Sequence, residues 1–268
     1  NPGPDGLMPT ADDIFGSPGV IRQDPSSDYA PDPVFNLLTQ VTGRHAPEIV
    51  AALYAPEAFW DGRASDTFVN PETLAVSIPT GGALESQIVG PPLNDIEMAH
   101  EARNWGQLTT KLATARPWAL ATNQPADAAA QIASHPNYPS LFTAAFGDAV
   151  ITAERIAFAI ASYERTLVPD QTPWDRFIAG QQNAMTQNQV AGWNQFNGPA
   201  RCANCHTPPL FSDNKFHNLG LRPDTEDNGR QSVTGVFADR GKFKTPSLRD
   251  AGLRPRFFHN GSETQLDN

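Results

Sequence analysis

Proline and glycine set the tightest limit on how this chain can fold. Its 268 residues include 25 prolines and 20 glycines, which together make up about one residue in six. Proline lacks a backbone N–H and has a fixed φ, so it interrupts long helices and long strands alike. We therefore expect short helices joined by long, ordered loops.

Composition excludes several other classes of protein. Hydrophobic residues make up 39% and charged residues 18% of the chain, which is typical of a globular protein rather than a disordered one. No stretch approaches the roughly 18 consecutive apolar residues of a membrane-spanning helix, so we expect no membrane span. The formal net charge of −10 argues against a nucleic-acid-binding surface, because such a surface needs clustered positive charge.

Three segments carry the signals of amphipathic helices. The spacing of apolar residues predicts a helix from Trp105 to near Arg116. Thr152 is a predicted N-cap for a second helix, which Pro169 ends. The apolar stripe expected to face the core in this second helix consists of Ile156, Ile160, Tyr163 and Leu167. A capping box at Thr186 starts the third helix, which leads toward the cysteines.

The remaining segments give weaker signals. Residues 1–42 have no sustained period and are expected to form either an ordered arm or a flexible lead-in. The segment around Pro169 is the expected hinge between two domains. Large aromatic side chains are usually buried, so Trp118, Trp174 and Trp193 are predicted core residues.

The two cysteines of the chain share one short motif with a histidine. Cys202 and Cys205 are followed directly by His206, and Cys-x-x-Cys-His is the attachment signature of c-type haem. Thiols three residues apart in a helical turn can reach both vinyl groups of one porphyrin, while the histidine lies beneath the iron. A structural zinc site would need further ligands, and a thioredoxin-like pair would need a βαβ context. The motif therefore predicts a covalently attached haem c with His206 as the proximal iron ligand.

Seven short blocks follow one another in a fixed order along the chain. They are Gly43-Arg44-His45-Ala46-Pro47, Phe59 to Ala64, Gln87-x3-Pro91-x5-Glu97-Met98, Tyr163 to Leu167, Phe216-His217-Asn218-x-Gly220, Lys244 to Arg249, and Phe258-His259-Asn260-Gly261. Together they resemble the bacterial dihaem cytochrome c peroxidase and MauG superfamily across nearly the whole chain. The resemblance implies a mainly α fold with two cytochrome c-like domains and long ordered loops. We place the N-terminal domain at residues 1–168 and the C-terminal domain, which carries Cys-x-x-Cys-His, at residues 169–268.

The resemblance also implies roles for individual residues. His206 matches the proximal ligand of the C-terminal, electron-accepting haem, and Trp60 matches a tryptophan between the two haems. Gln87, Pro91 and Glu97 match residues on the distal face of the N-terminal, peroxide-binding haem. There Glu97 would act first as a general base and then as a general acid.

Further residues are expected around the C-terminal haem. The family blocks place His217 and His259 near it, where they are expected to hydrogen-bond propionates or backbone. Arg249 and Arg254 are candidates to pair with the haem propionates, since arginine suits bidentate carboxylates; the alternative is a solvated charge. All four residues are thus expected on the cofactor's side of the C-terminal domain.

The family resemblance implies a calcium ion between the two domains. The backbone carbonyls of Lys244 and Pro246 are the expected ligands in this sequence. The asparagine that the family carries after Arg44 is His45 here, which weakens the site because hard cations prefer oxygen ligands.

The chain contains no second Cys-x-x-Cys-His upstream of residues 43–47. The resemblance therefore implies that the sequence is the interior of a longer polypeptide, with one haem attached in this chain and two haems in the full protein. Haem c is attached outside the bacterial cytoplasm, so the expected compartment is the periplasm or the cell surface.

These observations lead to one main functional hypothesis and two alternatives. The main hypothesis is a dihaem peroxidase that reduces hydrogen peroxide to water with electrons from a small cytochrome c or a cupredoxin, and the resemblance leaves a homodimer open. One alternative is a MauG-like or rubber-oxygenase-like enzyme that oxidises a protein or organic substrate; Ala200, where MauG carries a surface tryptophan, disfavours the MauG route. The other alternative is an electron carrier with a single haem on His206.

Overall fold

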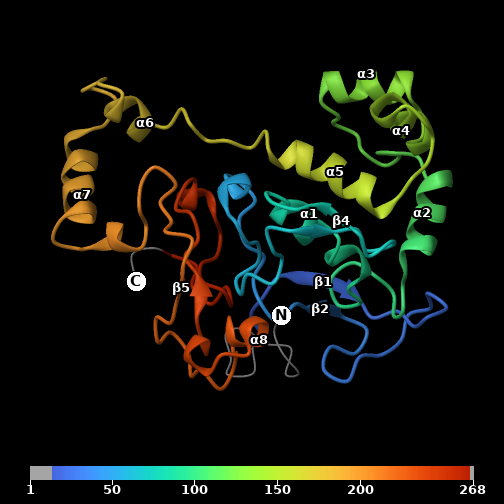
Figure 1. Ribbon diagram of the computed structural model, residues 1–268, viewed down its shortest axis with the longest axis horizontal. Coiled ribbons are helices and arrows are strands. Elements are labelled where there is room, and N and C mark those ends of the chain that lie inside the picture. The colour runs from blue at the N-terminus through green and yellow to red at the C-terminus, as the bar shows by residue number, and fades with distance from the viewer. Residues whose placement is uncertain (1–13, 266–268) are drawn as a thin grey trace.

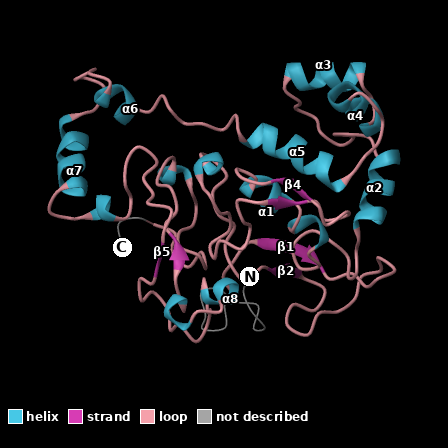
Figure 2. Cartoon of the chain, viewed as in Figure 1, coloured by secondary structure: helices cyan, strands magenta, loops and turns pink. Residues whose placement is uncertain are grey.

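Short helices and long loops dominate the structure, a computed structural model that describes residues 14–265 (Figures 1 and 2). The α-helices are α1 (Ala83–Ile88), α2 (Trp105–Thr114), α3 (Ala126–Ser134), α4 (Tyr138–Phe146), α5 (Ala153–Glu164), α6 (Pro173–Ile178), α7 (Gln187–Asn197) and α8 (Gln231–Thr234). Single 3-10 turns are η1 (Ala52–Tyr54), η2 (Pro91–Leu93), η3 (Cys202–Asn204), η4 (Phe237–Asp239) and η5 (Ala251–Leu253). The prediction of a mainly α chain with short helices and long ordered loops is confirmed.

The sheets among the described residues are small antiparallel pairs. They are β1 (Pro18–Ile21) with β2 (Thr39–Val41), β3 (Phe68–Val69) with β4 (Val76–Ile78), and β5 (Phe216–His217) with β6 (Phe243–Lys244). From residue 14 to residue 42 the segment expected to form an arm or a lead-in is an ordered arm built around β1 and β2. Residues 1–13 of that segment lie outside the described residues.

The two halves of the chain occupy different sides of the molecule. In Figure 1, α1 to α5 lie on one side, whereas α6, α7, β5 and α8 lie on the other. An extended segment after α5 crosses from one side to the other. The division of the chain into domains at residues 1–168 and 169–268 stays a prediction.

Local capping signals gave the correct helix starts. The Thr152 hydroxyl accepts a hydrogen bond from the backbone N–H of Arg155, and α5 begins at the next residue after Thr152. Thr186 and Gln189 form the predicted capping box of α7. The helix predicted from Trp105 is also present, as α2, and ends at Thr114. These contacts involve residues three apart, so sequence alone contains the information for them.

The hydrophobic core lies where α1 packs against α5. Its buried members are Phe68, Leu84, Ile88, Ala157 and Ala161. The ring of Phe68 is fully buried and meets the ring of Phe158 edge to face, with centroids 6.1 Å apart. Because alanine side chains are small, the backbone of α5 can approach α1 closely.

The face of α5 that enters the core is not the predicted one. Ala153, Ala157 and Ala161 are fully buried, whereas Ile160 is 41% exposed and Tyr163 is 62% exposed. The alanine stripe and the predicted stripe of larger residues both have the spacing of a helix face. Periodicity therefore could not distinguish them, and close packing against α1 selected the smaller side chains.

The prediction that three tryptophans are core residues was wrong for Trp118 and holds only in part for Trp174 and Trp193, which are half-buried. Trp174 and Trp193 pack against the ring of Phe211, with centroid distances of 4.8 Å and 6.3 Å. Trp118 instead lies in the loop between α2 and α3, where its side chain is 45% exposed. The prediction that Trp118 is a core residue was wrong, because the short α2 ends before this residue reaches a packed surface.

Arg44 joins three segments that are far apart in the sequence. Its guanidinium donates to Asp61 at 2.6 Å and makes two hydrogen bonds of 2.7 Å to the two carboxylate oxygens of Asp227. Burial alone would raise the pKa values of both aspartates, but the hydrogen bonds and charge of Arg44 outweigh it and lower them. A backbone hydrogen bond of 2.7 Å from His45 to His259 closes the same junction.

Replacing Ala157 by leucine tests the assigned core face of α5. We expect A157L to lower the free energy of unfolding by about 1–3 kcal/mol, because extra methylene groups would be forced into the contact between α1 and α5. The matched change I160S on the exposed stripe should cost at most about 0.5 kcal/mol. Urea denaturation measures both, and a larger loss for I160S than for A157L would show that the assigned face is wrong.

Removing the charge of Arg44 tests the junction. We expect R44M to lower the free energy of unfolding at pH 7 by about 3 kcal/mol, because two largely buried carboxylates lose their partner. In the wild type this stabilisation is complete above the ordinary aspartate pKa of 3.8 and is lost as pH falls toward the lower pKa values of the folded state.

The acid dependence distinguishes this junction from a surface ion pair. In R44M the loss of stability between pH 5 and pH 3 should become smaller than in the wild type. R22M, which breaks the exposed pair of Arg22 with Glu101, is the matched control and should cost less than about 1 kcal/mol. Equal costs for R22M and R44M in denaturation at pH 7 would contradict the assignment.

Candidate functional site

The Cys-x-x-Cys-His motif forms one helical turn after α7. Cys202 begins the 3-10 turn η3, and the backbone N–H of His206 donates to the Cys202 carbonyl at 2.9 Å. Both thiols are free, Cys202 is exposed and Cys205 is half-buried. The turn therefore holds two free thiols and the histidine that follows them within one short segment.

The orientation of His206 suits an iron ligand. Its Nδ1 lies 2.9 Å from the carbonyl oxygen of Phe211. A carbonyl can only accept, so Nδ1 carries the proton and Nε2 keeps a lone pair for a metal. The packing of Phe211 against Trp174 and Trp193 holds this carbonyl in place.

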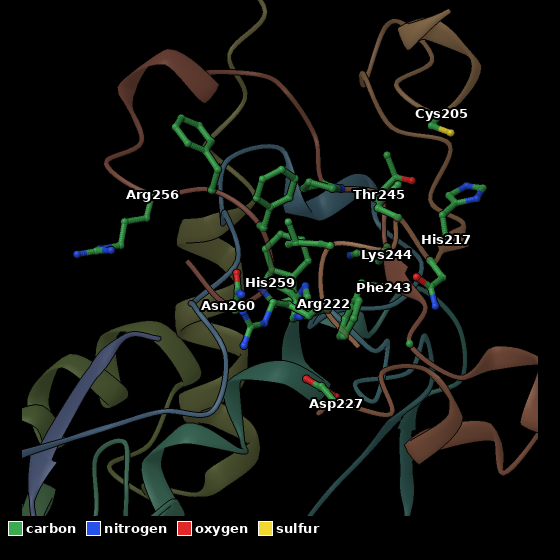
Figure 3. Close-up of a pocket in the computed structure, with 18 of the residues that line it drawn as sticks. Cys205, His217, Arg222, Asp227, Phe243, Lys244, Thr245, Arg256, His259 and Asn260 are labelled. Atoms are coloured by element: carbon green, nitrogen blue, oxygen red, sulfur yellow. The ribbon is translucent and has the colours of Figure 1, made fainter. Parts of the chain in front are cut away.

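A cavity of about 330 Å³ opens beside the motif (Figure 3). Cys205 and His206 lie in its wall, and Trp60, Phe243 and Phe257 contribute aromatic surface. Its volume falls within the range of roughly 300–1,000 Å³ that is common for ligand pockets. Two thiols, a correctly protonated imidazole and apolar walls are the groups that haem c needs, so these residues fit that cofactor.

The residues predicted to contact the cofactor divide into two groups. His217, His259 and Arg254 line the cavity. Arg249 is not among its lining residues, because its guanidinium is bonded to Asp175 at 2.8 Å. That hydrogen bond lowers the pKa of Asp175 to about 2. The structure thus pairs Arg249 with Asp175 away from the cavity, whereas Arg254 lines the cavity and is paired with Glu48 at 2.7 Å.

Trp60 lies at the boundary of this cavity. The residue is 7% exposed, and its indole N–H donates to the His45 carbonyl at 2.7 Å. The ring of His259 stacks on Phe243 at a centroid distance of 3.6 Å and meets Trp60 edge to face at 6.5 Å. Burial lowers the pKa of His259, so its ring is neutral at pH 7. Trp60 also lines a smaller cavity of about 60 Å³ next to residues 47–55.

Lys244 lines both cavities. Its backbone N–H donates to the Trp60 carbonyl at 2.8 Å, and its ammonium donates to the Glu57 carbonyl at 2.6 Å. Burial lowers the pKa of Lys244 to about 8, and the negative charge of Glu57 opposes this shift only in part. The ammonium of Lys244 is therefore held inside the molecule at the backbone of Glu57.

Glu97 is presented by a turn that Asn94 organises. The backbone N–H of Glu97 lies 3.1 Å from the side-chain oxygen of Asn94, and the Asn94 carbonyl accepts from Met98 and Ala99 at 2.9 Å each. Glu97 is half-buried, and this burial raises the pKa of its carboxyl while the nearby charge of Arg63 opposes the rise. A carboxyl with a raised pKa holds a proton more readily than an ordinary glutamate does, which suits a group that accepts and returns a proton.

The other residues predicted on the peroxide side, Gln87 and Pro91, lie on either side of Gly90. Gln87 is near the end of α1, its carbonyl accepts from Gly90 at 3.1 Å, and Pro91 begins η2. A Cβ atom on Gly90 would lie 3.9 Å from the Phe59 ring. The guanidinium of Arg63 lies over the same ring, 3.6 Å from its centroid. The backbone at Gly90, between Gln87 and Pro91, thus comes near Phe59, and the charge of Arg63 acts on Glu97. None of Gln87, Pro91 and Glu97 lines the cavity beside Cys205.

Sequence reasoning missed the contribution of Arg63 and of the N-terminal arm. Arg63 belongs to the block from Phe59 to Ala64. Its positive charge, close in sequence to Phe59 and Trp60, was the feature that could have predicted a contact with an aromatic ring. The arm supports the Glu97 turn directly, since the backbone N–H of Val20 in β1 donates to Ile96 at 2.9 Å. Gly19 permits this approach, because a Cβ atom there would lie only 1.9 Å from the Ile96 carbonyl oxygen. No local pattern predicts such a long-range contact.

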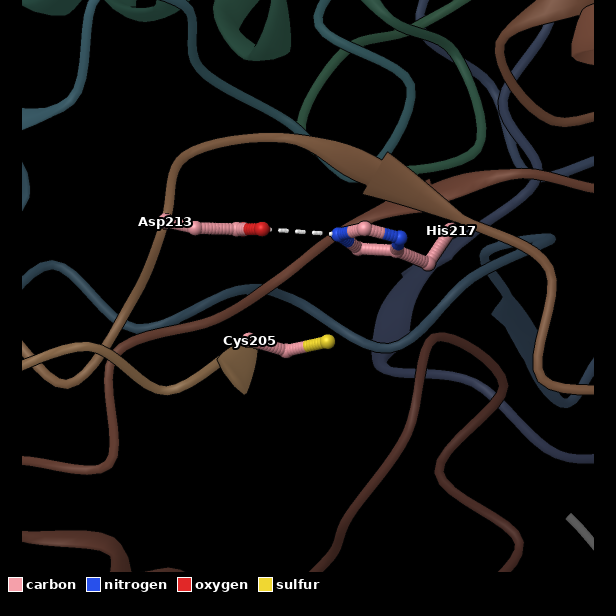
Figure 4. A group of neighbouring side chains, drawn as sticks. All are labelled: Cys205, Asp213 and His217. Carbon is pink, nitrogen blue, oxygen red and sulfur yellow. Dashed lines mark hydrogen bonds and ion pairs between the residues drawn. The ribbon is translucent and has the colours of Figure 1, made fainter. Parts of the chain in front are cut away.

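One group of side chains near the motif has the composition of a metal site (Figure 4). The ligand atoms of Cys205, Asp213 and His217 lie within 4.8 Å of one another, and the His217 ring is bonded to Asp213 at 2.8 Å. Within residues 14–265 no other group of three or more His, Cys, Asp or Glu side chains is so arranged. Because Cys205 belongs to the haem motif, Asp213 and His217 are best understood as neighbours of the attachment site.

The sequence predicts no membrane-spanning helix, and the helices of the structure agree with this. In the described part of the chain, every helix is too short or too polar to cross a lipid bilayer.

Comparisons with known sequences agree on one family. The family model described as di-haem cytochrome c peroxidase matches residues 27–183. The chain is 31% identical over 227 residues to a cytochrome c551 peroxidase of Nitrosomonas europaea, which covers 83% of this chain and 56% of that protein. It is 30% identical to the cytochrome c peroxidase Ccp of Escherichia coli, over 83% of this chain and 41% of that protein. A methylamine utilization protein MauG of Methylophilus methylotrophus is 39% identical over 47% of this chain and 38% of that protein.

Solved structures share the fold at lower sequence identity. A MauG-like protein associated with microbial copper homeostasis superposes with a TM-score of 0.57 at 21% identity, over 91% of this chain and 62% of that one. The diheme peroxidase BthA from Burkholderia thailandensis gives a TM-score of 0.58 at 18% identity, over 91% of this chain and 60% of that one. The chain spans about half the length of the curated peroxidases that it matches. The family model, the relatives and the haem motif lead to the same conclusion: this chain belongs to the dihaem cytochrome c peroxidase and MauG family.

Proposed function

We propose that the protein containing this chain is a dihaem peroxidase, which reduces hydrogen peroxide to water with electrons from a small cytochrome c or a cupredoxin. The observation that carries the proposal is the half-buried carboxyl of Glu97, whose pKa is raised by burial while the charge of Arg63 opposes the rise. Peroxidase relatives that cover 83% of the chain support it. One peroxide molecule then takes up two electrons and two protons and yields two molecules of water.

The haem groups set the redox chemistry of this proposal. In the chain itself, Cys202 and Cys205 would hold one haem c covalently and His206 would bind its iron. A second haem of the full protein would lie on the side of Glu97. When bound, these groups supply the electrons that peroxide consumes, and every proton must come through the protein or from water.

Glu97 is the proposed proton carrier. As a carboxylate it takes a proton from one peroxide oxygen, and as a carboxylic acid it returns the proton to the departing oxygen, which leaves as water. Burial raises the pKa of Glu97, and the nearby charge of Arg63 opposes this rise. Positioned proton transfer of this kind typically contributes 10²–10⁴-fold to a rate, roughly.

Trp60 is the proposed route for electrons between the two sides. Its indole lines the cavity beside Cys205, and Phe59, the preceding residue, lies on the Glu97 side with Arg63 over its ring. The indole N–H is bonded to a backbone carbonyl, which fixes the ring in one orientation. A buried, fixed aromatic ring shortens the gap that an electron must cross through saturated groups.

MauG-like chemistry is the second candidate. It is favoured by the 39% identity to a MauG protein over 127 residues. Ala200, at the position of the surface tryptophan that MauG carries, counts against it. Peroxide consumption that requires a reduced small redox protein would support the peroxidase, whereas oxidation of a protein or organic substrate would support this alternative.

Location and assembly follow from the same proposal. Because haem c is attached outside the bacterial cytoplasm, we place the protein in the periplasm or at the cell surface. A homodimer is the proposed assembly, and sedimentation of the full-length holoprotein measures it.

Replacing Glu97 tests the proposed reaction. In the full-length holoprotein we expect E97Q to lower kcat/KM for hydrogen peroxide by roughly 10²–10⁴, because glutamine can neither take nor return the proton. The wild-type activity should fall on the acid side at a pH above 4.5, the ordinary glutamate pKa, because the protonated carboxyl is no longer a base. Stopped-flow oxidation of a reduced cytochrome c measures both.

The matched control is an exposed carboxyl two residues away. D95N makes the same change of charge at an exposed site, so it should leave kcat/KM unchanged. Equal haem content in the three proteins, measured as pyridine haemochrome, excludes loss of cofactor as the cause. Wild-type turnover by E97Q would overturn the role of Glu97.

A calcium ion at the carbonyls of Lys244 and Pro246 is the remaining part of the proposal, and it rests on the family resemblance. Because His45 stands where an oxygen ligand is expected, we predict weak binding in the wild type and tighter binding in H45N. Calorimetric titration of the chelator-treated holoprotein with Ca²⁺ measures both affinities. Absence of calcium binding by either protein would contradict the prediction.

A further inference from the structure

Lys244 carries an unbalanced positive charge in the wall of the cavity beside Cys205. The side chain comes from β6, and its ammonium is bonded to a neutral group, the carbonyl of Glu57. The nearest acidic side chain, that of Glu57 itself, is committed to Arg230 at 2.7 Å. Among the described residues, no carboxylate oxygen lies within 4.0 Å of the Lys244 ammonium.

The other cations of the cavity wall differ from Lys244. Arg222 pairs with Glu226 at 2.8 Å, and Arg254 pairs with Glu48 at 2.7 Å. Arg256 is bonded to the carbonyl of Gly261, and its guanidinium points away from the cavity in Figure 3. Lys244 is therefore the buried cation of the cavity wall that has no anionic partner within the part of the chain that the structure describes. A buried charge is costly unless it is paired.

We propose that the counter-ion of Lys244 is a propionate carboxylate of the haem c held at Cys202, Cys205 and His206. A haem carries its two propionates on the edge opposite the two vinyl carbons that bind cysteine. Lys244 and Cys205 both line the same cavity, so a porphyrin attached at Cys205 would share that cavity with Lys244. The proposal rests on the haem attachment proposed above and does not depend on peroxide turnover.

The pairing has a measurable consequence for reduction of the haem. A cation at short range lowers the pKa of a carboxyl by about one to three units, so the paired propionate stays ionised at and below neutral pH. Without the cation, the propionate pKa rises and the carboxyl takes up a proton when the haem is reduced. The midpoint potential then becomes dependent on pH, and above the propionate pKa it lies below the wild-type value because a positive charge is gone.

The experiment is a spectroelectrochemical titration of the full-length holoprotein between pH 5 and pH 7, which lies below the pKa of about 8 of Lys244. In K244M we expect the potential of the haem on His206 to fall as pH rises, with a slope that approaches one proton per electron. The wild type and K244R, which keeps the charge, should show no such slope. K215M removes an exposed lysine of the same region and should behave like the wild type.

Other titrating groups of the cavity do not confuse this comparison. His217 is bonded to Asp213, and His259 is stacked on Phe243, and none of the variants changes these four residues. The two histidines therefore contribute equally to every curve of midpoint potential against pH. The result is the difference between the curve of K244M and that of the wild type.

Two results would overturn the proposal. One is a K244M potential that follows the wild-type curve at every pH. The other is a wild-type potential that shifts when chloride or inorganic phosphate is added, since the counter-ion would then be a free anion. If K244M does not retain haem, K244R decides, because a pH slope in K244R would show that the retained charge pairs with no propionate. Loss of peroxide turnover with the potentials unchanged would count against the proposed function alone.

Discussion

The structure depends on the ionic junction that holds the loop of Trp60 between the two halves of the chain. Asp61, next to Trp60, accepts from Arg44, and Arg44 in turn holds Asp227 of the C-terminal half. Arg230 donates to the backbone carbonyls of Asp61 and Gly62 from the same side. Gly62 has a φ of 72°, and a Cβ atom there would lie 2.5 Å from the ring of Phe216, so only glycine fits. Charged hydrogen bonds of this kind are short and directional, and they fix the place of an aromatic ring better than apolar contact alone.

The two halves are stabilised by different means. In the N-terminal half, α5 lies against α1 with alanines in the contact, and Phe68 fills the remaining space. In the C-terminal half, rings around Phe211 pack behind His206, while other aromatic side chains line a cavity in front of it. A porphyrin is a large apolar body, so haem c would complete the interior of this half as well as supply its chemistry. The histidine that binds the iron would then belong to the hydrophobic core and to the redox site at once.

The features that sequence predicted correctly are those decided by near neighbours. The capping residues Thr152 and Thr186, the turn of Cys-x-x-Cys-His and the shortness of the helices depend on residues a few positions apart. The core face of α5 was not predictable, because two stripes of equal period compete and only the distant α1 decides between them. Arg249 was assigned to the cofactor although Asp175, 74 positions away, engages it. The support of the Glu97 turn by β1 is equally long-range, and its one trace in the sequence is Gly19.

A chain of charges connects the junction to the proposed catalytic carboxyl. Asp61 accepts from Arg44 and also from Arg63, and Arg63 is the cation whose charge lowers the proton affinity of Glu97 against the effect of burial. The position and the effective charge of Arg63 therefore depend on Asp61, and Asp61 depends on a contact between the two halves. A shift of one half against the other would alter Trp60 and Arg63 together, because both flank Asp61. The electron route and the proton affinity of Glu97 are then set by the same contact, so the two parts of the proposed reaction cannot be adjusted independently.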